Sequence, residues 1–117
     1  MSKNQIKIDD LRGKPYKQKG RGPDGFDCYG LCMEVSRRFG VELPKLRDLL
    51  ECEFKSIEKP ERGALVLIEA VDTRHVGIML DKRTLFQIRD NKCGAHTIKI
   101  NDPRIKDRII GYYKYVG

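Results

Sequence analysis

The sequence predicts an α+β domain in which N-terminal helices pack on one antiparallel β-sheet. Three observations lead to this fold class. The length of 117 residues suits one hydrophobic core, so we expect a single domain over 1–117. Apolar residues recur at helical spacing only in the first half of the chain, and apolar runs of strand length follow one another from Arg62 onward.

The first predicted element is a helix over about 28–39. Asp27 is a good N-cap, apolar residues recur behind it at helical spacing, and Gly40 is a suitable C-cap. A short second helix is predicted to begin at Leu43-Pro44, because proline suits the first helical position. The residues on the apolar face of this second helix are Leu46, Leu49 and Leu50.

Five strands follow, each an apolar or β-branched run. The predicted strands are 64–69, 75–80, 84–88, 96–100 and 109–116. Short polar connections between the second and third of them, and between the first and second, indicate antiparallel neighbours.

Cys28 is the first candidate for chemistry. A helix that begins at this residue places its sulfur in the first turn, where unpaired N–H groups and the helix dipole favour the thiolate, the nucleophilic form. The neighbouring Gly25 and Gly30 would let backbone and substrate come close. The alternative is a buried structural cysteine, a role that Cys32 fits better because it falls on the apolar face of the helix.

His75 is the candidate base. Alternation along its strand puts His75 and Gly77 on one face, and a glycine there leaves room for another group to approach. If the next strand pairs across the turn, Gln87 shares that face and can orient the imidazole through its amide oxygen. His96 is the competing base, but it lacks such a companion. Two histidines and four cysteines allow several pairs, so spacing alone leaves the pairing open.

Five segments resemble the NlpC-type cell-wall endopeptidases. They are 13–16 (GKPY), 20–25 (GRGPDG), 26–31 (FDCYGL), 62–67 (RGALVL) and 75–80 (HVGIML). An aromatic residue after the cysteine and the segment 40–44 (GVELP) look most like the bacteriophage tail branch of that family.

This resemblance implies a papain-like fold and hydrolysis of peptide bonds in peptidoglycan stem peptides, commonly the γ-D-glutamyl-diaminopimelate link. It implies a catalytic triad of Cys28, His75 and Gln87, with Tyr16 assisting the oxyanion. The family often has serine at the position of Tyr29 and histidine at the position of Gln87. Tyr29 is therefore expected to make the cleft beside the nucleophile bulkier.

Charge suggests how substrate is held. The net charge is +7, and basic residues outnumber acidic ones just ahead of the cysteine. Stem peptides carry free carboxylates, so we expect cations of this segment to meet them. The expected oxyanion and substrate-binding residues are Tyr16, Arg21, Asp27 and Tyr29, and the further cations near the cleft are Lys14, Lys17 and Lys19.

Motifs and charge also bear on other functions. Without a C-x-x-C pair or a matching histidine pair we expect no metal and no cofactor, and nothing beyond charge suggests nucleic acid. Residues 1–10 lack the apolar stretch of a secretory signal, and no apolar run is long enough for a membrane span. We expect a phage tail or virion component, cytoplasmic before assembly, that acts at the bacterial cell wall beside other tail proteins. The alternatives are a weak or inactive tail module of the same fold, which binds wall or tail proteins, and a cytosolic peptidase acting on another amide.

Overall fold

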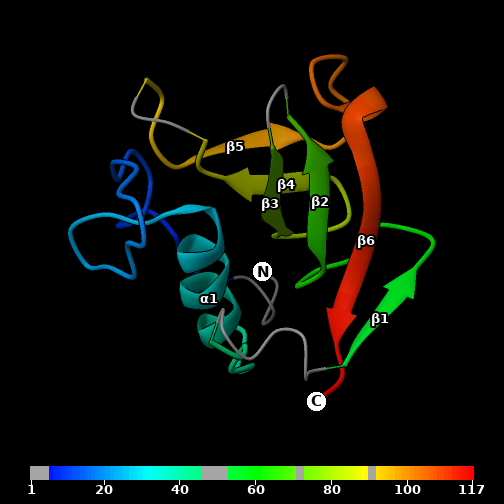
Figure 1. Cartoon of the computed structure of the whole chain (residues 1–117), viewed down its shortest axis with the longest axis horizontal. Coiled ribbons are helices and arrows are strands. Elements are labelled where there is room, and N and C mark those ends of the chain that lie inside the picture. Colours follow the sequence, from blue (N-terminus) through cyan, green and yellow to red (C-terminus); the bar gives the residue numbers. More distant parts are fainter. Residues whose placement is uncertain (1–5, 46–52, 71–72, 90–91) are drawn as a thin grey trace.

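A computed structural model of the chain describes residues 6–45, 53–70, 73–89 and 92–117. In this part of the chain one α-helix packs against a six-stranded antiparallel sheet (Figure 1). The α+β prediction is confirmed. The second helix, predicted to begin at Leu43-Pro44, falls largely on residues 46–52, which lie outside the described residues. The elements are α1 (Cys28–Arg38), β1 (Phe54–Ile57), β2 (Leu65–Glu69), β3 (Arg74–Met79), β4 (Thr84–Gln87), β5 (His96–Lys99), a short 3-10 helix (Lys106–Arg108) and β6 (Ile109–Tyr115).

Helix α1 begins at the predicted residue and ends at Arg38, one residue before the predicted end. The Asp27 side chain accepts a hydrogen bond from the Gly30 N–H at 2.6 Å, which satisfies one of the free donors of the first turn. At the other end Gly40 has a φ of 91°, a conformation that favours glycine and stops the helix. Leu31, Cys32 and Val35 are completely buried, so this face of the helix forms the core against β3 and β4.

The five predicted strands are all present, and no strand end differs from the prediction by more than one residue. The strand that the sequence did not predict is β1, which lies at the edge of the sheet and pairs with β6. Its sequence, FKSI, is short and half polar, so its own pattern is weak. Contact between the Phe54 and Tyr115 rings, 5.3 Å between centroids, stabilises it from the far end of the chain.

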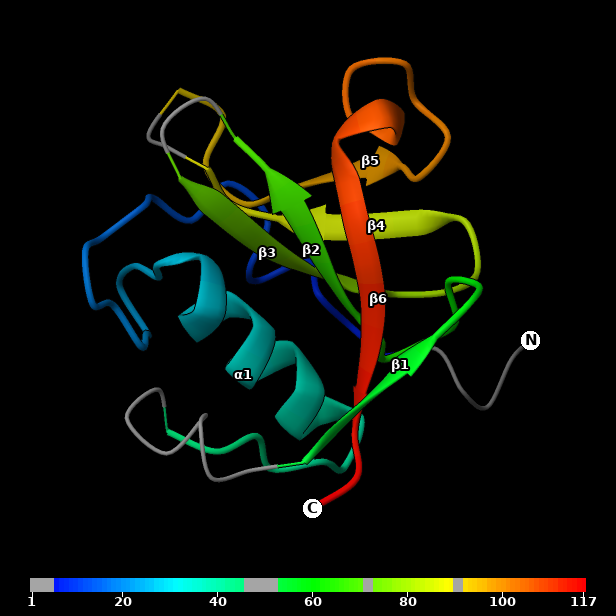
Figure 2. The same ribbon diagram turned by 45° about the vertical axis from the view of Figure 1, so that its right-hand side comes forward.

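The strand order is β1-β6-β2-β3-β4-β5, with antiparallel pairs throughout (Figure 1, Figure 2). Strands β2 to β5 are therefore neighbours in chain order, and β6 returns to insert between β1 and β2. The blue N-terminal segment lies beside the start of α1 in both views. This topology brings side chains of β3, β4 and β5 into adjacent positions. Among the described residues, no helix is both long and apolar enough to cross a bilayer.

Candidate active site

The nucleophile candidate sits at a helix start. Cys28 is the first residue of α1 and is half-buried, with Asp27 as the N-cap ahead of it. The free N–H groups of the first turn and the helix dipole favour negative charge at this position. The helix thus supplies both the place and the electrostatic support for a thiolate.

A glycine-rich loop holds this helix start in place. Loop 20–25 folds against Phe26, which is 2% exposed and forms backbone bridges with Tyr16 and Arg21. A Cβ on Gly30 would lie only 2.1 Å from the Gly20 carbonyl oxygen. The room that glycine provides is therefore filled by the backbone of the loop itself, whereas the sequence suggested that substrate would share it.

His75 and Gln87 lie together as the strand pairing predicts. His75 Nε2 lies 2.9 Å from Gln87 Oε1, and both side chains are buried. Gly77, which lies two residues after His75 on the same face of β3, is needed for this contact. A Cβ on Gly77 would lie 2.7 Å from Leu85 Cδ1 and 3.3 Å from Gln87 Cβ, so its absence lets β4 come close to β3.

The surroundings of His75 favour its neutral form. Burial lowers the pKa of this imidazole below its usual value, the hydrogen bond with Gln87 raises it, and the nearby Arg89 and His96 lower it again. The net direction is downward. A neutral imidazole can take up a proton, as a general base must.

Cys28 and His75 line one hollow open to solvent, about 340 Å³ in volume. Helix and sheet thus bring the sulfur and the imidazole to the same opening, as the sequence analysis required. The residues that line the hollow are Tyr16, Cys28, Ala70, Thr73, Arg74, His75 and Arg89.

Tyr16 reaches this hollow from the N-terminal segment. Burial raises the pKa of its hydroxyl, and so does the proximity of Cys28 and Asp27. The hydroxyl therefore keeps its proton and can donate a hydrogen bond to an oxygen that gains negative charge in the hollow.

Three predicted substrate-binding residues lie elsewhere. The Arg21 guanidinium donates to Asp27 Oδ1 at 2.7 Å and to the Gly20 carbonyl at 2.9 Å, and so clamps the loop onto the helix start. Tyr29 is only 6% exposed, and its hydroxyl donates to the Pro44 carbonyl at 2.6 Å. Asp27, Arg21 and Tyr29 are absent from the lining of the hollow. The expectation that Tyr29 makes the cleft beside the nucleophile bulkier is wrong, because the Tyr29 ring is buried in the core and does not line the hollow.

Two arginines that the sequence analysis missed line the hollow. Arg74 immediately precedes the histidine, and Arg89 follows Gln87 by two residues. The register of β3 and β4, extended towards the strand ends, places Arg89 beside His75. Counting two residues on from Gln87 along the same face would have found it. Positive charge at the hollow thus comes from the sheet, whereas the sequence analysis expected it from the N-terminal segment.

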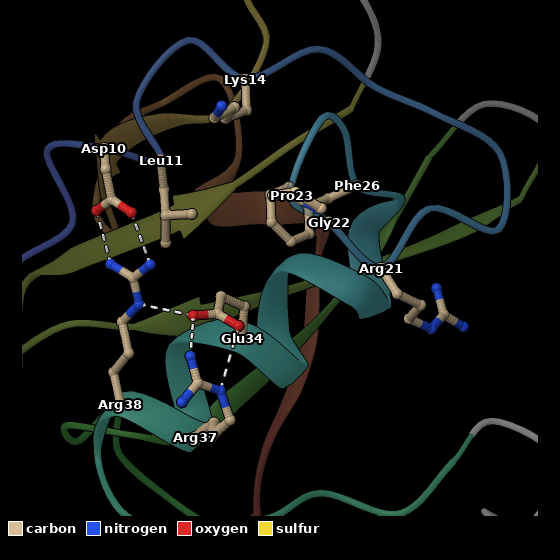
Figure 3. A pocket seen from close by; sticks show the side chains of 10 residues that line it. All are labelled: Asp10, Leu11, Lys14, Arg21, Gly22, Pro23, Phe26, Glu34, Arg37 and Arg38. Atoms are coloured by element: carbon tan, nitrogen blue, oxygen red, sulfur yellow. Dashed lines mark hydrogen bonds and ion pairs between the residues drawn. The ribbon is translucent and has the colours of Figure 1, made fainter.

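A second and larger hollow, about 440 Å³ in volume, is lined by residues of the N-terminal segment, of loop 20–25 and of α1 (Figure 3). Lys14 and Arg21 line it, but no cysteine or histidine does. A chain of ion pairs crosses it: the Arg38 guanidinium donates to both carboxylate oxygens of Asp10 at 2.7 Å and to Glu34 at 2.8 Å. This network fastens the N-terminal segment to α1, and it offers no nucleophile or base, so size alone does not identify the active site.

The residues 6–45, 53–70, 73–89 and 92–117 hold no group of three or more side chains suited to bind a metal ion. The thiols described in them, Cys28, Cys32 and Cys93, are free.

Comparisons with known proteins identify the family and the fold. The sequence profile of the NlpC/P60 family matches residues 13–113. A search of curated proteins finds no significant match.

Solved structures share the fold. A protein similar to a lipoprotein of the NLP/P60 family from Staphylococcus aureus is 24% identical, with a TM-score of 0.68 over 92% of this chain and 38% of its own. An NlpC/P60 family protein from Bacillus cereus is 20% identical, with a TM-score of 0.71 over 97% of this chain and 41% of its own. The NlpC/p60 domain of the peptidoglycan hydrolase SagA is 18% identical, with a TM-score of 0.64 over 89% of each chain. The chain thus spans less than half the length of the first two proteins.

Proposed function

Because the chain belongs to the NlpC/P60 family, we propose that it is a cysteine peptidase that hydrolyses peptide bonds in the stem peptides of bacterial peptidoglycan. One observation carries the proposal: Cys28 at a helix start and a buried His75 line the same solvent-open hollow. The likeness to the domain of a peptidoglycan hydrolase supports the choice of substrate.

The proposed reaction has two steps. His75 takes the thiol proton as the Cys28 sulfur attacks the scissile carbonyl carbon, and the imidazolium then protonates the leaving amine. The C–N bond breaks and a thioester remains. A water molecule loses a proton to His75, attacks the thioester and releases the carboxylic acid, which regenerates the thiol. Gln87, bonded to Nε2, leaves Nδ1 of His75 as the nitrogen that exchanges these protons.

The negative oxygen of the tetrahedral intermediates needs donors. The Cys28 backbone N–H belongs to the first turn of α1, whose N–H groups have no partner within the helix, and Tyr16 lines the same hollow as Cys28. Both are proposed as oxyanion donors. Tyr16 suits this role because burial and the nearby sulfur raise the pKa of its hydroxyl.

The bond proposed is the γ-D-glutamyl-diaminopimelate link, which is flanked by free carboxylates. Arg74 and Arg89 give the hollow the positive charge that suits such groups. We also propose that the protein works as a phage tail component. Tyr29 after the cysteine and the segment 40–44 support that part, and immunogold labelling of phage particles, with label on tails as the expected result, tests it.

Digestion of purified peptidoglycan tests the activity. The native protein should release fragments with one new amine and one new carboxyl group, and mass analysis identifies the bond. Cys28→Ala and His75→Ala should release none, while Cys93→Ser, which alters an exposed thiol outside the hollow, should behave as the native protein does. Fragment release by Cys28→Ala at the native rate would reject the proposal.

A second candidate is a wall-binding module without activity. Gln87 favours this candidate. The family often has histidine at this position, whereas glutamine is neutral and orients the imidazole without adding positive charge beside it. In that case the native protein should sediment with peptidoglycan and leave it uncut.

A further inference from the structure

The sheet carries a second histidine that has no part in the proposed reaction. His96 on β5 lies directly opposite Gln87 on β4, and Gln87 is bonded to His75 on β3. We propose that His96 is a positioning residue: through the Gln87 amide it fixes the tautomer of His75 in which Nδ1 is free to accept the Cys28 proton. This inference rests on the proposed function and assigns a role to a residue outside the triad.

The row of hydrogen bonds that joins Gly94, His96, Gln87 and His75 begins at a group that can only accept, which fixes the direction of donation at that end. His96 Nδ1 lies 2.8 Å from the Gly94 carbonyl oxygen, which can only accept, so Nδ1 carries the ring hydrogen. The other nitrogen of the neutral ring is then an acceptor. It lies 3.3 Å from Gln87 Nε2, which donates to it. Gln87 therefore turns its NH₂ group to His96.

The amide oxygen of Gln87 is left for the other histidine. It accepts from His75 Nε2 at 2.9 Å, so the hydrogen of His75 is on Nε2 and Nδ1 is unprotonated. Glutamine alone cannot impose this, because its amide can turn over and present NH₂ instead. A turned amide would donate to His75 Nε2 and drive the ring hydrogen onto Nδ1, the nitrogen that the reaction needs free.

Burial and backbone contacts keep the row in place. Gln87 is 1% exposed, so bulk water has little access to its amide. The turn at Gly94 is fixed by the N-terminal segment: the Gly13 N–H donates to the Ala95 carbonyl at 2.8 Å, and the Ala95 N–H donates to the Lys14 carbonyl at 2.9 Å. The end of the row is thus anchored on main chain.

The substitution His96→Arg tests the inference, because arginine donates and cannot accept. We expect the Gln87 amide to turn over and the hydrogen of His75 to move to Nδ1. A base held in the wrong tautomer costs about 10⁴-fold in a serine peptidase triad, so a loss of at least about 100-fold in kcat/KM is expected. Adding Gln87→Glu should restore the Nε2–H form and much of the activity, since a carboxylate only accepts. Rescue of this kind would not follow from a purely structural role of His96.

Ring ¹⁵N NMR near pH 8.5 reports the tautomers directly, in the absence of substrate. The chain has two histidines, so each His96 variant leaves a single imidazole to observe. The native protein should show Nε2–H at His75 and Nδ1–H at His96, and His96→Arg should show Nδ1–H at His75. If His96→Arg does not fold, His96→Ala serves instead and should give a mixture of both tautomers at His75.

A His75 that stays wholly Nε2–H in either variant would overturn the inference, as would failure of Gln87→Glu to restore that form beside His96→Arg. The two proposals remain distinguishable. A native protein that shows the expected tautomers and leaves peptidoglycan uncut would refute the proposed function, while the assignment of His96 would stand.

Discussion

The substitution Gly77→Ala tests whether the close spacing of β3 and β4 positions Gln87. The added methyl group would lie 2.7 Å from Leu85 Cδ1, 3.1 Å from the Phe86 carbonyl oxygen and 3.3 Å from Gln87 Cβ. Carbon atoms in contact prefer about 3.5–4.0 Å, so the overlap with Leu85 approaches about 1 Å. Leu85 is fully buried and the Phe86 oxygen is main chain, so β4 itself must shift.

Two effects should follow from that shift. Overpacking of this size lowers the free energy of unfolding by about 1–3 kcal/mol. Displacement of Gln87 from His75 should lower kcat/KM by about 100-fold, the typical cost of a 1 Å misplacement. Urea unfolding measures the first effect, and hydrolysis of a defined stem peptide measures the second.

Ile78→Val is the matched control, because Ile78 is fully buried but belongs to the core cluster on the α1 side of the sheet. It should cost about 0.5–1.5 kcal/mol of stability and leave kcat/KM unchanged. If Gly77→Ala is destabilised and yet keeps the native kcat/KM, the reasoning about strand spacing is refuted.

Four further predictions concern residues that line the hollow. Tyr16→Phe should lower kcat by about 10²–10³-fold through loss of one oxyanion donor, and an unchanged kcat would remove that role. The acid limb of kcat/KM should lie below pH 6.5, because the pKa of His75 is lowered from that value; a limb above it would contradict the assignment. Below pH 6.5 the imidazole of His75 binds a proton more readily in the unfolded chain than in the folded one. The free energy of unfolding should therefore decrease as the pH is lowered, and it should decrease less in His75→Gln. Arg74→Gln and Arg89→Gln should raise KM and weaken its salt dependence, while Lys17→Gln, outside the hollow, should change neither.

Local patterns predicted much of the fold and part of the site. An N-cap, a C-terminal glycine and regular apolar spacing define α1, and alternation along two paired strands is enough to place Gln87 beside His75. These signals are local because each depends on residues a few positions apart or on one hairpin.

What the sequence could not supply depends on distant packing. Tyr29 is turned into the core by the carbonyl of Pro44, and no pattern around the cysteine announces that contact. Likewise β1 is a strand because β6, from the other end of the chain, pairs with it. Arg74 lines the hollow from a strand end, where exposure is set by how the neighbouring loop leaves the sheet, whereas alternation beyond Gln87 would have been enough to find Arg89.

The reacting pair belongs to two different layers of the molecule. The sulfur is carried by α1 and the imidazole by β3, and the layers are held apart by Leu31, Ile78 and Phe86, all fully buried. The distance between the sulfur and the imidazole, which a proton must cross, therefore depends on the size of the buried side chains between the two layers. Removing most of one of these side chains, as in Phe86→Ala, should make turnover fail at temperatures where the secondary structure is still intact, whereas the loss of a single methylene group, as in Ile78→Val, is small enough for the two layers to keep their spacing.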